Sequence, residues 1–207
     1  RIVDNYYPPG SIVAETFLPP TLYPGYTDMK FHPYDVEGAK ALLAEAGYPD
    51  GFTVDLTYRA AVRTYLPLPD KVAQELQAQL AEAGITVNIQ LMESTSFLDD
   101  LFVGKLPMSL IGGNGDYPDA TNLYDWIFNN PSTSSIGEPY PDIAAELSAA
   151  GKLGDPAARQ VHYDKANELF KEYVPIVPIA HGASSTAWLK SVQNPHSSPF
   201  NKEAFQV

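Results

Sequence analysis

Two loops of this sequence combine charged and phenolic side chains with the spacing of a small-molecule binding site. The loops are residues 59–67 and 112–119, and each follows an apolar stretch of the chain. The side chains concerned are Arg63, Tyr65, Asp116, Tyr117 and Asp119. A guanidinium group binds a carboxylate through two parallel hydrogen bonds, and an aspartate accepts hydrogen bonds from an ammonium group. If both loops lie at one edge of the fold, these residues predict a site for a zwitterionic solute.

The secondary structure predicted around these loops indicates that the two loops lie close together. Residues 52–58 and 85–91 alternate apolar and polar positions, and an apolar stripe with helical spacing lies between them at 70–83. Strand, helix and strand within forty residues form a βαβ unit, so the two strands should be parallel with a right-handed crossover. A third strand is predicted at 106–111. In open α/β sheets, ligands bind beyond the carboxyl ends of the strands, which is where both loops begin.

The remaining elements complete a single α/β domain over residues 1–207. Asp35 and Asp155 have the residue type and position of helix N-caps, and Pro156 suits a first helical position. Residues 1–34 are rich in Pro, Gly and Tyr and are predicted to be extended. The further helices are predicted at 35–47, 96–103, 121–128, 141–150 and 155–173, and later strands at 174–180 and 185–189.

Composition excludes several classes of function. The 207 residues include no cysteine, which rules out disulfides, Fe–S clusters and cysteine nucleophiles. The formal net charge is −12, and a nucleic-acid-binding surface needs clustered Lys and Arg instead. No apolar run of about 18 residues is present, so no membrane-spanning helix is predicted. The chain opens directly at Arg1-Ile2 without a signal peptide, which suggests a cut inside a longer protein.

Other interpretations of the two loops remain open at this point. Arg63 and Asp116 could form a surface ion pair, or remain as two solvated charges. The glycine-rich run 112–115 resembles a phosphate-binding loop, but two aspartates follow it and would repel phosphate. Asp116, Asp119 and Asp125 could bind calcium, although their spacing is not that of an EF-hand. Asp116 and Asp119 could also serve a carboxylate-based hydrolase.

The four histidines do not show metal-ligand spacing, and His181, at the end of a predicted strand, is the one that merits inspection.

Several segments together resemble the family 5 extracellular solute-binding proteins. The segments are Phe31–Phe52 with its Ala46-Gly47-Tyr48 ending, Val72–Gln77, Ala83–Val87, Gly115–Asp119, Asp155–Arg159 and Val174–Pro178. Members of this family are the dipeptide and oligopeptide receptors of ABC importers. The likeness covers nearly all of the chain and is specific in combination.

The resemblance implies a fold and roles for the loop residues. It implies a lobe of the type II periplasmic-binding-protein kind, with a mixed, mostly parallel sheet flanked by helices. Such receptors are about twice as long, so the chain would be their second lobe, with hinge-proximal segments at 1–20 and 194–207. Arg63 would bind the peptide carboxylate, Tyr65 would lie beside it, and Asp116 would hold the peptide amine.

The same resemblance implies partners and a location. The partners would be a solute, the missing first lobe and an ABC permease in the membrane. The protein would be periplasmic or extracellular, with a lipoprotein anchor possible in the full-length chain, and it would have no cofactor and no enzymatic activity. Oligosaccharides, glutathione and nickel complexes are alternative solutes, and a sensory lobe that binds a partner protein is an alternative role.

Overall fold

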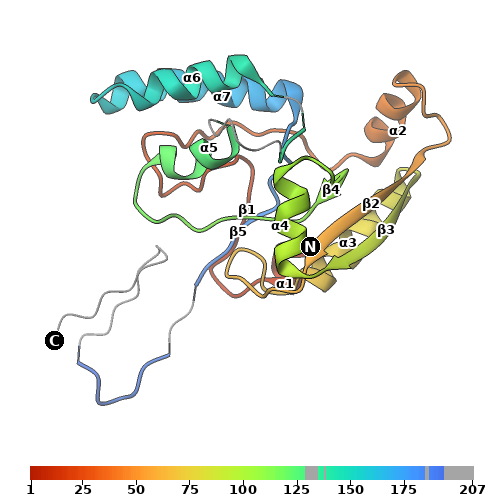
Figure 1. The fold of residues 1–207 in the computed structure, drawn as a ribbon, viewed down its shortest axis with the longest axis horizontal. Coiled ribbons are helices and arrows are strands. Elements are labelled where there is room, and N and C mark those ends of the chain that lie inside the picture. The colour runs from red at the N-terminus through yellow and green to blue at the C-terminus, as the bar shows by residue number, and fades with distance from the viewer. Residues whose placement is uncertain (129–134, 138, 185–186, 194–207) are drawn as a thin grey trace.

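The centre of the molecule is a three-stranded parallel sheet with the order β3-β2-β4 (Figure 1). The strands are β2 (Phe52–Arg59), β3 (Ile85–Met92) and β4 (Met108–Ser109). The computed structural model describes residues 1–128, 135–137, 139–184 and 187–193. The predicted βαβ unit is confirmed, and β4 lies directly beside β2, so both candidate loops leave the sheet at its carboxyl edge.

The register of the central strand pair begins at Phe52 opposite Ile85. Just before these residues, Gly51 and Gly84 have φ of +74° and +94°, a region that glycine adopts without strain. A Cβ atom on Gly51 would lie 1.8 Å from the carbonyl oxygen of Gly84. The two glycines therefore allow a close backbone approach that sets the strands in register.

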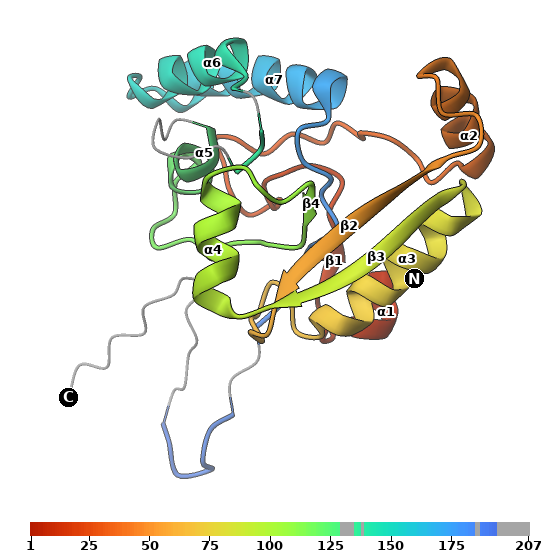
Figure 2. The ribbon, with the colours of Figure 1, turned by 45° about the vertical axis from the view of Figure 1, so that its right-hand side comes forward.

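Helices cover the sheet and continue into a separate helical layer. α3 packs along β3 and β2, and α4 contacts β2, while α6 and α7 lie against each other at the far side of the molecule (Figure 2). The helices are α1 (Ile2–Tyr6), α2 (Val36–Glu45), α3 (Pro69–Glu82), α4 (Ser94–Phe102), α5 (Ala120–Phe128), α6 (Pro141–Gly151) and α7 (Pro156–Tyr173). Asp35 and Asp155 cap α2 and α7 as predicted, each accepting from a backbone N–H three residues on.

Two apolar cores result from this arrangement. The sheet core lies between the strands and α3 and is centred on Leu56, Val72 and Val87. The helical core joins α5, α6 and α7 and contains stacked aromatic rings of Tyr124, Tyr163 and Phe170. The second candidate loop runs from the sheet core to the helical core, because it connects β4 with α5.

The N-terminal segment differs from the prediction of an extended chain. It contains α1 and a two-residue strand β1 (Ile12–Val13), which pairs antiparallel with β5 (Ala180–His181). The pairing joins residues almost 170 positions apart, so no local pattern could indicate it. Burial lowers the pKa of His181, which lies in β5.

The predicted strand at 174–180 is mostly wrong. Only Ala180 is in a strand, and the residues before it include Pro175 and Pro178, which lack the N–H that a sheet ladder needs. Of the strand predicted at 185–189, residues 185–186 lie outside the described residues and 187–189 are not in a strand. The hinge-proximal segment expected at 194–207 also lies outside the described residues.

Helix α2 forms where predicted but buries none of its residues. Leu42, on its apolar stripe, is 67% exposed. Helix-forming signals are local, whereas burial needs a neighbouring element, and the described part of the chain leaves every residue of α2 at least partly exposed. None of the helices in the described part of the chain combines the length and apolar character of a membrane crossing.

Candidate functional site

The two candidate loops lie against each other at the carboxyl edge of the sheet. The Thr64 hydroxyl donates to the side-chain oxygen of Asn114 over 3.0 Å. The ring of Tyr65 lies on Gly112, where a Cβ atom would be only 2.7 Å from Cδ2 of the ring. These contacts join the middle of the first loop to the beginning of the second, as the topology predicted.

Arg63 occupies a tight turn in the first loop. Its backbone pairs with Leu66 through two hydrogen bonds, 3.3 Å from the Arg63 N–H and 3.0 Å back to the Arg63 carbonyl. The side chain is exposed, and its Nη1 donates to the carbonyl of Val62 over 3.2 Å. Within the described residues no carboxylate pairs with this guanidinium, so its charge is available to a ligand.

Asp116 is the corresponding anion in the second loop. Its backbone N–H donates to the side-chain oxygen of Asn122 over 2.7 Å, which fixes the main chain at this point. The Asp116 side chain is exposed, and among the described residues its carboxylate has no hydrogen-bond or ion-pair partner. The neighbouring Tyr117 is 48% exposed. Arg63 and Asp116 stand one and two residues, respectively, from the Thr64–Asn114 contact.

Tyr65 lies deeper than Arg63 and is held on several sides. Its phenolic oxygen accepts from Nη2 of Arg59 over 2.9 Å, and Nη1 of Arg59 donates to the Ser94 hydroxyl over 3.2 Å. The Tyr7 hydroxyl donates to the Tyr65 carbonyl over 3.0 Å. Arg59 is the last residue of β2, and Ser94 is the first residue of α4, which follows β3, so the carboxyl ends of both strands contribute to this edge.

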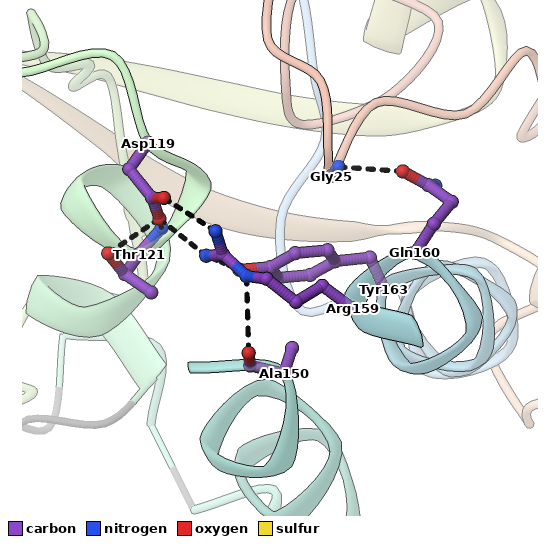
Figure 3. A network of polar contacts seen from close by, with 7 residues as sticks. All are labelled: Gly25, Asp119, Thr121, Ala150, Arg159, Gln160 and Tyr163. Carbon is purple, nitrogen blue, oxygen red and sulfur yellow. Dashed lines mark hydrogen bonds and ion pairs between the residues drawn. The ribbon is translucent and has the colours of Figure 1, made fainter. Parts of the chain in front are cut away.

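Asp119 has a different environment from Asp116, three residues earlier. Nη1 and Nη2 of Arg159 donate to its two carboxylate oxygens, each over 2.7 Å, and the N–H and hydroxyl of Thr121 donate to Oδ1 (Figure 3). The hydrogen bonds from Arg159 lower the pKa of Asp119 to about 2. The carboxylate is therefore ionised at neutral pH, with both oxygens already engaged.

Arg159 in turn connects the loop to the helical core. Its Nε donates to the carbonyl of Ala150 over 3.2 Å, and its Nη2 donates to the Tyr163 hydroxyl over 2.8 Å (Figure 3). Beside it on α7, Gln160 accepts from the backbone N–H of Gly25 over 2.8 Å. The hydrogen bonds with Asp119 raise the pKa of Arg159, so the ion pair persists across the physiological range.

This geometry limits what the site can do. A carboxyl group with a pKa of about 2 cannot act as a general acid at neutral pH, so Asp119 does not suit the paired-carboxylate mechanism of a hydrolase. Within the described residues no group of three or more His, Cys, Asp or Glu side chains is placed to hold a metal ion.

Two arginines with structural roles, Arg59 at the sheet edge and Arg159 at the helical core, were not among the predicted site residues. Arg159 had a usable signal, because a cation in the first turn of a helix faces the positive end of the helix dipole and needs a nearby anion. Arg59 was predicted to be the first residue of the loop at 59–67, but its bond to the Tyr65 hydroxyl depends on the turn at 63–66. That turn has no distinctive sequence pattern.

Comparison with known sequences gives a family. Residues 1–135 match the sequence profile of the bacterial extracellular solute-binding proteins, family 5. The chain is 29% identical over 210 residues to heme-binding protein A of Haemophilus influenzae, which covers 99% of this chain and 38% of that protein. It is 30% identical over 207 residues to di/tripeptide-binding protein 3 of Pseudomonas aeruginosa, covering 99% of this chain and 39% of that protein. The chain thus spans less than two-fifths of the length of these curated relatives.

Solved structures agree with this relationship. A dipeptide-binding protein from Pseudoalteromonas sp. SM9913, in complex with Met-Leu, superposes with a TM-score of 0.81 at 29% identity, over 87% of this chain and 36% of that one. HbpA2 from Haemophilus parasuis superposes with a TM-score of 0.80 at 30% identity, over 87% and 36% of the two chains. The fold is that of the type II periplasmic binding proteins, as the resemblance implied.

Proposed function

This chain belongs to the family 5 bacterial extracellular solute-binding proteins, and on that premise we propose that it is a ligand-binding lobe of a receptor that delivers a peptide to an ABC importer. The receptor would work in the periplasm or at the outer surface of the cell and would pass its solute to a permease. Residues 1–207 would form one lobe, and the rest of the receptor would supply the opposite wall of the site. The share of the relatives that the chain spans is compatible with this division.

One observation carries the proposal. A cation and an anion that have no ion-pair partner among the described residues, Arg63 and Asp116, stand on two loops that touch at the carboxyl edge of a parallel sheet. A peptide with free ends carries one carboxylate and one ammonium group. Arg63 would bind the carboxylate, and Asp116 would accept hydrogen bonds from the ammonium group.

The neighbouring residues have supporting roles in this proposal. Tyr65 and Tyr117 would contact the peptide with their rings and hydroxyls, since both lie beside the charged groups and keep part of their surface open. Asp119 would contribute indirectly, by fixing the end of the loop that carries Asp116, because its own oxygens are bound to Arg159 and Thr121.

Relatives support solute binding but differ in the solute. One is named as heme-binding and others as dipeptide- or di/tripeptide-binding proteins. The pair of opposite charges favours a peptide over heme, because heme carries carboxylates but no ammonium group. Heme is therefore the second candidate, and it is favoured only by the likeness to heme-binding protein A.

The test is isothermal titration of the full-length receptor with a set of dipeptides and with heme. We expect micromolar or tighter binding of at least one dipeptide, and a loss of roughly tenfold or more on Arg63→Gln and on Asp116→Asn. Two matched controls, Lys40→Gln and Asp50→Asn, remove exposed charges near the amino end of the sheet and should leave the affinity unchanged. If dipeptides bind the wild type and neither site variant weakens them, the assignment of the site is wrong. Binding of heme alone would replace the peptide proposal.

A further inference from the structure

The four arginines of the chain fall into two groups. Arg1 pairs with Glu75, and Arg159 pairs with Asp119. Arg59 and Arg63 both stand at the carboxyl edge of the sheet, and within the described residues neither has a carboxylate partner. Of these two, Arg63 is exposed and well solvated, whereas Arg59 is half-buried.

A half-buried cation without a counter-anion is costly, because burial removes water from the charge without supplying an opposite one. Arg59 donates one hydrogen bond to Ser94 and one to Tyr65, and both acceptors are neutral hydroxyl oxygens. These bonds orient the guanidinium but leave its charge uncompensated. An anionic ligand at this edge would compensate it.

The direction of the Arg59–Tyr65 hydrogen bond adds a second argument. A guanidinium group can only donate, so the Tyr65 oxygen is the acceptor in this bond. The proton of the Tyr65 hydroxyl is therefore left to donate elsewhere, and no acceptor for it lies among the described residues. A hydroxyl that accepts from a cation is also a stronger donor, since neighbouring hydrogen bonds polarise one another.

The position of this hydroxyl is fixed before any ligand arrives. The ring of Tyr65 lies on Gly112, and its carbonyl accepts from Tyr7. Burial raises the pKa of Tyr7 to about 12, so this donor keeps its proton at neutral pH. A preorganised donor loses little conformational freedom when it binds an acceptor.

We propose that Arg59 is a specificity-determining residue of the site, which acts through the Tyr65 hydroxyl to select solutes that present a carboxylate over solutes that present the corresponding neutral amide. The inference rests on the proposed function, because it names the solute group that this end of the site accepts. Arg63 supplies attraction from an exposed position, whereas the Arg59–Tyr65 pair supplies a fixed donor with a positive charge behind it.

The test compares a dipeptide with its C-terminal amide on the full-length receptor by isothermal titration. The wild type should prefer the free carboxylate, and Arg59→Gln should reduce this preference by roughly tenfold. Tyr65→Phe should reduce it by a similar factor, and the double variant should lose little more than either single variant, because both remove the same hydrogen-bonded unit. Arg59→Lys, which keeps the charge, should retain part of the preference.

Matched controls separate this role from a structural one. Lys71→Gln removes an exposed cation of α3 and should leave the preference for the carboxylate unchanged. If Arg59→Gln weakens the dipeptide and the amide equally, Arg59 is only structural and the inference fails. It also fails if the effects of Arg59→Gln and Tyr65→Phe simply add.

A second measurement keeps the inference testable if no peptide binds the wild-type receptor, which would refute the proposed function. Acetate and acetamide are titrated into the 207-residue chain and followed by ¹H–¹⁵N NMR. Acetate, but not acetamide, should shift the Nε–H signal of Arg59 and the amide signals of residues 60–66. The shifts of these amide signals should disappear in Arg59→Gln and Tyr65→Phe. Equal shifts with both compounds, or none with acetate, would overturn the inference.

Discussion

Asp116 and Asp119 belong to the same loop and differ completely in their surroundings. Asp119, at the entrance to α5, is bound by Arg159 and Thr121 and is 29% exposed. Asp116, towards the sheet edge, is exposed, and its carboxylate has no partner among the described residues. The same contrast separates Arg159 from Arg63. The charges of Asp119 and Arg159, next to the helical core, pair with each other, whereas those of Arg63 and Asp116, at the sheet edge, have no ion-pair partner among the described residues.

The largest expected loss of stability follows from removing the Arg159 side chain. Arg159→Met would leave the Asp119 carboxylate partly buried and unpaired, and would also remove the bonds to Ala150 and Tyr163. We expect a loss of about 2–4 kcal/mol in the free energy of unfolding, measured by urea denaturation. Lys165→Met, on the same helix but 55% exposed and 4.0 Å from Glu146, should cost less than about 0.5 kcal/mol. A loss of under about 1 kcal/mol for Arg159→Met would contradict the view that the charges beside the helical core stabilise the fold more than those at the sheet edge.

The Asp119–Arg159 ion pair should also make the stability of the protein depend on pH in acid. The folded-state pKa of Asp119, about 2, lies below its ordinary value of 3.8, so its contribution to stability is present above pH 4 and is lost as the pH falls towards 2. Between pH 4 and pH 2, the wild type should lose about 1–2 kcal/mol more than Asp119→Asn. Urea denaturation at a series of pH values measures the difference. Parallel curves for the two proteins would show that the pair contributes nothing to stability.

The contact between the two loops is expected to give a smaller effect. Gly112→Ala places a Cβ atom 2.7 Å from the ring of Tyr65, and the ring must move. Overpacking of this kind should cost about 1 kcal/mol and should shift the NMR signals of Tyr65. Gly113→Ala is the matched control, because its Cβ would lie 3.6 Å from Trp126, an ordinary contact. Equal stability of the two variants would show that the loops are not closely packed.

The smallest effect on stability is expected at the sheet edge. Asp116→Asn and Arg63→Gln remove charges that have no ion-pair partner among the described residues, so each should change the free energy of unfolding by less than about 0.5 kcal/mol. Thermal denaturation monitored by circular dichroism is the measurement. A loss of more than about 1 kcal/mol in either variant would mean that these charges also support the fold, and the two groups of charges would no longer differ.

Local patterns predicted the fold best where the elements follow one another along the chain. The alternation in 52–58 and 85–91 and the helical stripe between them define β2, α3 and β3, and their order requires a parallel pair. The β1–β5 pair could not be predicted, because its strands have two residues each and lie far apart in the sequence. Pro175 and Pro178 explain why, of the strand predicted at 174–180, only Ala180 is in a strand.

The site was predicted in part, because local patterns and strand order indicate some contacts but not those between distant segments. Strand order alone indicated that the loops after β2 and β4 would meet, and the Thr64–Asn114 contact agrees with that expectation. The partner of Asp119 lies 40 residues away on α7, and sequence gives no register between a loop and a distant helix. Whether Arg63, Tyr65, Asp116, Tyr117 and Asp119 bind a ligand stays a prediction.

The firm attachment of this loop at one end has an evolutionary consequence. Because Asp119 is tied to Arg159, residues 116 and 117 can be exchanged with little risk to folding. If these two residues contact the solute as proposed, new side chains there would alter which molecule is bound while the fold is kept. Diversification within such a lineage should therefore concentrate on the open part of the loop, and inherited constancy on its anchored end.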